Sequence, residues 1–70
     1  MLRTSVVSSN IRSVGYDEIQ RILEVEFTTR RIYEYYRVPP TVYSGLMASA
    51  SHGKYFSRFI KKVYECSRIK

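Results

Sequence analysis

The sequence contains one cysteine, Cys66, and no tryptophan among its 70 residues. A single thiol cannot form a disulfide within the chain, which argues against a small secreted protein held together by disulfides and favours a reducing compartment. No apolar run approaches the roughly 20 residues that a membrane-spanning helix needs, and residues 1–5 lack the apolar core of a signal peptide. We therefore expect a soluble cytoplasmic protein without membrane contact.

Glycine and proline are also scarce, with three and two copies, and no low-complexity linker or internal repeat divides the chain. A chain of this length buries only about 60% of the surface that its unfolded form exposes, so its core is modest. Hydrophobic residues make up 44% of the sequence and include seven tyrosines and three phenylalanines. This composition argues against intrinsic disorder and predicts one folded domain over residues 1–70.

Acidic residues are few, six against twelve lysines and arginines, and their distribution is uneven. Six basic residues and one acidic residue lie beyond Ala50, which places +5 of the net charge of +6 in the last twenty residues. Such asymmetry indicates an anionic partner, although charge alone does not specify which one.

The first half of the chain has the pattern of β-strands. Residues 11–16 predict a first strand that a turn at Asp17 ends, with a bulge at Gly15 as one way to orient its apolar residues. In the next segment Leu23, Val25 and Phe27 alternate with polar neighbours, so these three side chains should face the core. Residues 31–38 then predict the third strand of an antiparallel meander.

The loop between the second and third predicted strands sets their register. A three-residue loop over residues 28–30 turns Tyr33 and Tyr35 toward the core, places Glu24 opposite Glu34, and requires a left-handed backbone at Arg30. A two-residue loop avoids that strain but buries Glu34 against the core. Burying an unpaired carboxylate costs more free energy, so we expect the three-residue loop.

Two helices are predicted after Pro39 and Pro40, which end the sheet and suit a first helical turn. The first helix should extend to about Ala50, with Val42, Leu46 and Ala50 in its apolar stripe. Ser51 should cap the second helix, which the pattern extends from Lys54 to Cys66. Its predicted buried side consists of Phe56, Phe59, Ile60 and Val63, opposite a basic face. The expected fold class is α+β, a three-stranded antiparallel β-meander followed by two α-helices packed on one face.

An ordered set of residues carries a family resemblance from about Ser8 to Tyr64. The set comprises Ser8-Ser9-x-Ile11, Gly15-Tyr16-Asp17, Leu23-x-Val25-x-Phe27, Tyr33-x-Tyr35, Val38-Pro39-x-x-Val42-Tyr43, Ala50-Ser51-x-Gly53-x-Tyr55-Phe56 and Ile60-x-x-x-Tyr64. It resembles the KTSC domain, which is named for the C-terminal extension of some lysyl-tRNA synthetases and also occurs as a stand-alone protein in bacteria and phages. The family commonly has an acidic residue and glycine at the hairpin tip, where this chain has Thr29-Arg30. The resemblance implies RNA binding, which the synthetase context suggests.

The basic helix and the resemblance together predict a small non-catalytic module that binds nucleic acid, RNA in preference to DNA. Cations should neutralise phosphates, and exposed tyrosines should stack on unpaired bases. The predicted binding residues are Lys54, Tyr55, Arg58, Lys61, Lys62, Arg68 and Tyr36. Two alternatives remain open: a solvated helix face without a partner, and a phage or bacterial regulator that binds an acidic protein. We expect a monomer or weak homodimer.

Metal binding and catalysis have little support in the sequence. Glu24, Glu26 and Glu34 would repel one another across the sheet unless Arg12, Arg21 or a divalent metal compensated them, and arginine is the commoner solution. His52 and Cys66 are too far apart to form a pair, and no glycine-rich phosphate loop is present. An enzyme built on Glu24, Glu34 and His52 is the third hypothesis. We predict no catalytic residue, no metal and no cofactor.

Overall fold

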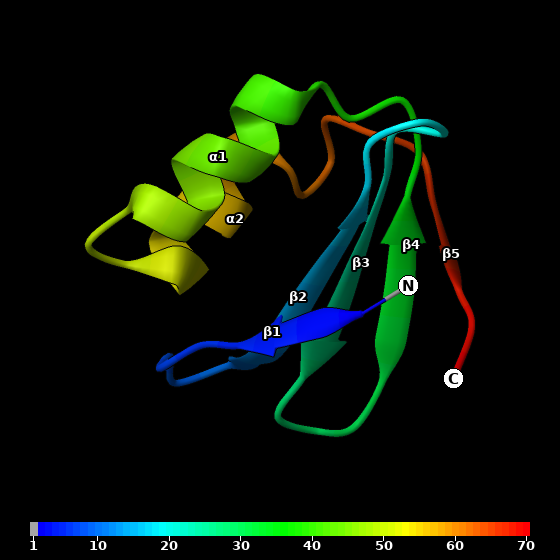
Figure 1. Ribbon diagram of the computed structural model, residues 1–70. Coiled ribbons are helices and arrows are strands. Elements are labelled where there is room, and N and C mark those ends of the chain that lie inside the picture. The colour runs from blue at the N-terminus through cyan, green and yellow to red at the C-terminus, as the bar shows by residue number, and fades with distance from the viewer. Residues whose placement is uncertain (1) are drawn as a thin grey trace.

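The computed structural model describes residues 2–70. Its seven elements, in chain order, are β1 (Arg3–Ser5), β2 (Ile11–Asp17), β3 (Ile22–Phe27), β4 (Ile32–Tyr35), α1 (Pro40–Ala48), α2 (His52–Phe59) and β5 (Cys66–Arg68). The strands form one antiparallel sheet in sequence order, and the two helices lie together against one face of it (Figure 1). The predicted α+β class is confirmed, but the sheet has five strands where three were expected.

The two unpredicted strands form the edges of the sheet. In β1, Arg3 pairs with Gly15 of β2, and in β5, Cys66 pairs with Tyr35 of β4. Each edge strand has three residues, all exposed. Strands this short and exposed lack the hydrophobic alternation by which strands are recognised in a sequence. They form through backbone pairing with β2 and β4, which a local pattern does not reveal.

A β-bulge in β2 reconciles its apolar residues with one core face. The pairing with β3 shifts between Ile11 and Ser13, whereas Gly15 pairs regularly with Glu24. The bulge considered at Gly15 therefore lies nearer the start of the strand. The extra residue reverses the alternation, and both Ile11 and Val14 become fully buried.

The hairpin between β3 and β4 has the predicted register. Leu23 pairs with Tyr35, Glu24 with Glu34 and Val25 with Tyr33, so the predicted core-facing side of this hairpin is confirmed, with Phe27 and Tyr33 only partly buried against the core. Arg30 has a φ of 73°, and its N–H donates to the carbonyl of Phe27 at 2.9 Å. The hairpin therefore has a left-handed backbone at Arg30, and this register keeps the Glu34 carboxylate off the core face of the sheet.

Replacing Arg30 by glycine should raise the free energy of unfolding by about 1 kcal/mol, because glycine adopts the left-handed backbone without a Cβ clash. Urea unfolding followed by far-ultraviolet circular dichroism measures this. Thr29→Gly is the matched control, since Thr29 is not among the residues with positive φ and glycine there should only destabilise. A loss of stability in Arg30→Gly would contradict the assigned loop.

Helix α1 packs on the sheet through Leu46, which is fully buried. The helix ends at Ala48, so Ala50, expected at the end of its apolar stripe, is instead exposed beyond it. The two helices approach closely, because a methyl group at Gly45 would overlap the phenol ring of Tyr55. Only glycine permits this contact.

Helix α2 has the predicted cap, begins at His52 instead of Lys54, and ends earlier than expected. The Ser51 hydroxyl accepts the N–H of Lys54 at 3.3 Å, which confirms the cap. The helix stops at Phe59, and a turn with Lys62 at a φ of 67° leads to β5, so the predicted extension to Cys66 is wrong. Among the expected core residues Phe56 and Ile60 are buried, but Phe59 and Val63 are 46% and 60% exposed.

Neither helix in residues 2–70 has the length and apolar character needed to cross a membrane.

Candidate nucleic-acid interface

Two adjoining hollows border α2. The first, which we call the polar hollow, has a volume of 560 Å³ and lies between residues 7–10 and residues 50–54, with Ser57 and Arg58 at its side. The second, the aromatic groove, has a volume of 530 Å³ and lies between the core face of the sheet and the end of α2. Asn10 and Ser57 line both hollows, so the two are continuous along the helix.

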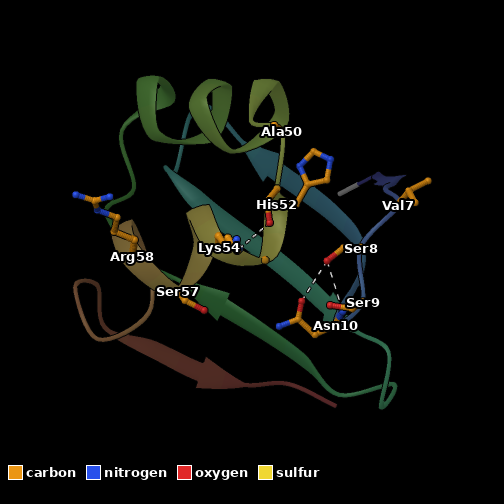
Figure 2. A pocket seen from close by; sticks show the side chains of 11 residues that line it. Val7, Ser8, Ser9, Asn10, Ala50, His52, Lys54, Ser57 and Arg58 are labelled. Atoms are coloured by element: carbon orange, nitrogen blue, oxygen red, sulfur yellow. Dashed lines mark hydrogen bonds between the residues drawn. The ribbon is translucent and has the colours of Figure 1, made fainter.

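The polar hollow joins segments that are at least forty residues apart in the sequence (Figure 2). The Ser8 hydroxyl lies 3.1 Å from Oδ1 of Asn10 and 3.4 Å from the backbone N–H of Asn10, which closes a tight turn before β2. A Cβ at Gly53 would lie 2.6 Å from Oδ1 of Asn10. Ser8 therefore closes the loop on itself, and the absence of a Cβ at Gly53 lets this loop approach the start of α2 closely.

His52 stabilises the connection between the helices. Its Nδ1 lies 2.8 Å from the carbonyl oxygen of Leu46, and since a carbonyl only accepts, Nδ1 carries the proton. Figure 2 shows the ring turned toward the end of α1. Glu24 and Glu34 point from the opposite face of the sheet, so the arrangement of Glu24, Glu34 and His52 considered for an enzyme is not formed. Within residues 2–70, no group of His, Cys, Asp and Glu side chains is placed to hold a metal.

Five aromatic rings line the aromatic groove: Phe27, Tyr33, Tyr35, Phe56 and Tyr64. The Phe27 ring meets Tyr33 at 5.8 Å and Phe56 at 5.4 Å, both edge to face. Burial, followed by the neighbouring Cys66 and Tyr33, raises the pKa of Tyr35 to about 12. The Tyr35 hydroxyl therefore keeps its proton at neutral pH and remains a hydrogen-bond donor in the groove.

The charged side chains that line the two hollows are all basic. Lys54 and Arg58 line the polar hollow, Lys61 and Lys62 line the aromatic groove, and all four are exposed. Among residues 2–70, no carboxylate lines either hollow. The acidic residues lie elsewhere, at Asp17, Glu18, Glu24, Glu26, Glu34 and Glu65. Both hollows are thus electrostatically suited to an anion.

The predicted site residues do not share one helix face. Lys54 and Arg58 lie on α2, whereas Lys61 and Lys62 lie in the following turn and Arg68 in β5, where its Nε donates to the carbonyl of Lys70 at 3.1 Å. The chain leaves the helix early because residues 66–68 pair with β4. The predicted continuous basic helix face is therefore wrong.

The two tyrosines proposed for stacking lie outside the aromatic groove. Tyr55 is half-buried, with its ring 4.7 Å from that of Phe59. Tyr36 lies on the outer face, where its hydroxyl is 3.4 Å from Oε1 of Glu34. The groove instead contains Tyr33, Tyr35 and Tyr64, of which the first two had been assigned to the core.

The acidic cluster on the outer face has an arginine partner that differs from the expected ones. Arg3 of β1 forms the ion pair with Glu24 and approaches Glu26 at 4.0 Å, whereas the expected Arg12 acts on Glu26 through its charge and not through an ion pair. The Ser13 hydroxyl donates to Glu26 at 2.7 Å. This hydrogen bond, followed by the positive charges of Arg12, Arg3 and Lys70, holds the pKa of Glu26 below its usual value.

Comparison with known proteins identifies the family. Residues 7–64 match the model of the KTSC domain. The crystal structure of a KTSC domain protein from Yersinia pestis superposes with a TM-score of 0.96 at 36% identity, over 99% of this chain and 97% of that one.

Two curated relatives are of different lengths. An uncharacterized protein of Stutzerimonas stutzeri is 44% identical over 87% of this chain and 86% of its own length. The lysine–tRNA ligase of Nostoc punctiforme is 33% identical over 87% of this chain, but the match covers only 11% of the ligase. The chain belongs to the KTSC domain family.

Proposed function

We propose that the protein binds RNA through the two hollows that border α2. The observation that carries the proposal is the segregation of charge, because four exposed cations and no carboxylate line these hollows within residues 2–70. Lysine and arginine side chains gathered along one surface neutralise phosphates and release condensed counterions, which drives binding without sequence preference. Lys54, Arg58, Lys61 and Lys62 are the proposed phosphate contacts.

The choice of RNA over other polyanions has independent support from the relatives. Three of the curated matches are lysine–tRNA ligases, whose name states an RNA substrate, and each aligns with 87% of this chain. A domain shared between such a ligase and a small protein is consistent with a common ligand. We therefore place RNA before DNA and before an acidic protein.

A salt titration tests the proposal quantitatively. Each phosphate neutralised on a single strand contributes about −0.7 to the slope of log affinity against log salt, so four cations predict a slope of about −2.8. Raising the salt from about 50 mM to about 200 mM should weaken binding of a short unstructured RNA about 50-fold. In the variant Lys61→Gln with Lys62→Gln, the same change should weaken binding only about 7-fold. Fluorescence anisotropy of labelled RNA measures both.

The matched control removes two exposed cations that line neither hollow, Arg12→Gln with Arg21→Gln. It changes the net charge equally and should leave the slope of the unaltered protein. An equal loss in both double variants would show that only net charge matters. Equal competition by poly-glutamate of matched charge would contradict RNA and favour an acidic protein partner.

A further inference from the structure

We infer that the aromatic groove holds an unpaired nucleobase, which makes the ligand of this domain a single-stranded segment of RNA and not a duplex. The inference rests on the proposed RNA binding and specifies the form of RNA. It assigns a role to the groove, whereas the proposed function requires only the cations around it.

The shape and lining of the groove fit a flat aromatic group. Its volume of 530 Å³ lies within the range of about 300–1,000 Å³ typical of small-ligand sites. Phe27, Tyr33 and Tyr64 are each only partly buried against the core, so part of each side chain remains accessible. Phe27 and Tyr33 meet edge to face at 80°, one of the arrangements that aromatic rings prefer with one another.

The charge around the groove selects a nucleobase over an uncharged aromatic ligand. Lys61 and Lys62 line the groove, so a base placed there brings its phosphate close to two ammonium groups. Asn10 and Ser57, at the junction with the polar hollow, bring an amide and a hydroxyl that can meet polar atoms of a base or ribose. A strand that continues into the polar hollow then meets Lys54 and Arg58.

Stacking of a base on the aromatic rings of the groove requires a base that is not paired in a duplex. Bases in a duplex are stacked on each other and expose only their edges, whereas bases in single strands and loops can insert between aromatic side chains. Every base has a flat π-face, so the groove should tolerate different sequences. A duplex would retain only the phosphate contacts.

The test compares tyrosine variants at matched positions. Tyr33→Leu and Tyr64→Leu remove rings from the groove, and Tyr36→Leu removes a half-buried ring from the outer face of the sheet. Each groove variant should weaken binding of a single-stranded 12-nucleotide RNA about tenfold, with the salt slope unchanged. Tyr36→Leu should change the affinity less than twofold. Unchanged affinity in both groove variants would overturn the inference.

A second measurement uses only the unaltered protein, so its outcome does not depend on whether a variant folds. The unaltered protein should bind an oligomer with the same phosphates but abasic sugars about tenfold more weakly than the complete RNA. Its fluorescence arises from tyrosine, since tryptophan is absent, and should be quenched by the complete RNA and not by the abasic oligomer.

Two outcomes separate the inference from the proposed function. If duplex, abasic and single-stranded RNA bind equally and binding still depends on Lys61 and Lys62, the inference of a base in the aromatic groove is wrong. The proposed RNA binding through the cations would then still hold. If none of them binds at about 50 mM salt, the proposed function fails and the inference fails with it.

Discussion

Replacing Ile60 by alanine should lower the free energy of unfolding by about 3 kcal/mol, whereas Phe59→Ala and Val63→Ala should each lower it by about 1 kcal/mol or less. Ile60 is fully buried, so truncation removes buried methyl groups and leaves a cavity beneath the end of α2. Phe59 and Val63 are 46% and 60% exposed, so their truncation costs little transfer free energy.

Urea unfolding of the three variants, followed by far-ultraviolet circular dichroism, distinguishes the observed fold from a longer helix. In a helix from Lys54 to Cys66, Val63 would lie on the same face as Phe56 and Ile60, and all three would be core residues. A loss for Val63→Ala as large as that for Ile60→Ala would therefore contradict the helix end at Phe59. Ser57→Ala, an exposed position on α2, serves as the control for helix content.

The central hairpin was predictable because two independent constraints agreed. The alternation of Leu23, Val25 and Phe27 identified the buried face of one strand. The cost of burying Glu34 then selected the three-residue loop and the left-handed Arg30, as the structure shows. The local sequence is sufficient to predict a strand's orientation where turning the wrong face inward would bury a charged side chain at a cost of more than about 1 kcal/mol.

The end of α2 was not predictable in the same way. The apolar spacing from Phe56 to Val63 continues a helical period, and nothing local stops it. The chain turns because residues 66–68 can pair with β4, a contact between segments about thirty residues apart. Cooperative pairing across the sheet thus overrides a local helical pattern.

This difference explains what was missed at the candidate interface. The four cations around α2 were identified from charge alone, but the groove beside them exists only because α2 stops at Phe59. The turn that follows brings Lys61, Lys62 and Tyr64 to the edge of the sheet beside Tyr33. A continuous helix would have placed these lysines on its outer face, away from the tyrosines.

The second large effect concerns Arg3, because Arg3→Ala should lower the free energy of unfolding by about 2 kcal/mol at neutral pH. The side chain of Glu24 is only 10% exposed, yet it lies directly opposite Glu34 in the sheet and forms its ion pair with Arg3. Removing one partner of a buried pair costs about 3–5 kcal/mol, and the 31% exposure of Arg3 reduces this value.

A double variant separates the charge from the packing. If the cost arises from a carboxylate left without a partner, then Arg3→Ala with Glu24→Gln should recover about half of the loss. Arg31→Ala, which removes an exposed arginine at the hairpin, should cost less than about 0.5 kcal/mol. Equal losses in Arg3→Ala and Arg31→Ala would show that β1 contributes no compensating charge to the sheet.

Acid provides an independent check with a defined sign. The pKa of Glu26 is held below its ordinary value of 4.5, first by the Ser13 hydroxyl and then, less strongly, by Arg12, Arg3 and Lys70. A carboxyl group whose pKa is lower in the folded state stabilises the fold at pH values above its pKa in the unfolded state. For Glu26 this contribution is lost as the pH falls below 4.5 and through the pKa of the folded state. Arg3→Ala lacks part of this contribution, so the difference in stability between this variant and the unaltered protein should narrow as the pH falls below 4.5. A deficit that stays constant across this range would assign the role of Arg3 to packing of its aliphatic stem and not to its charge.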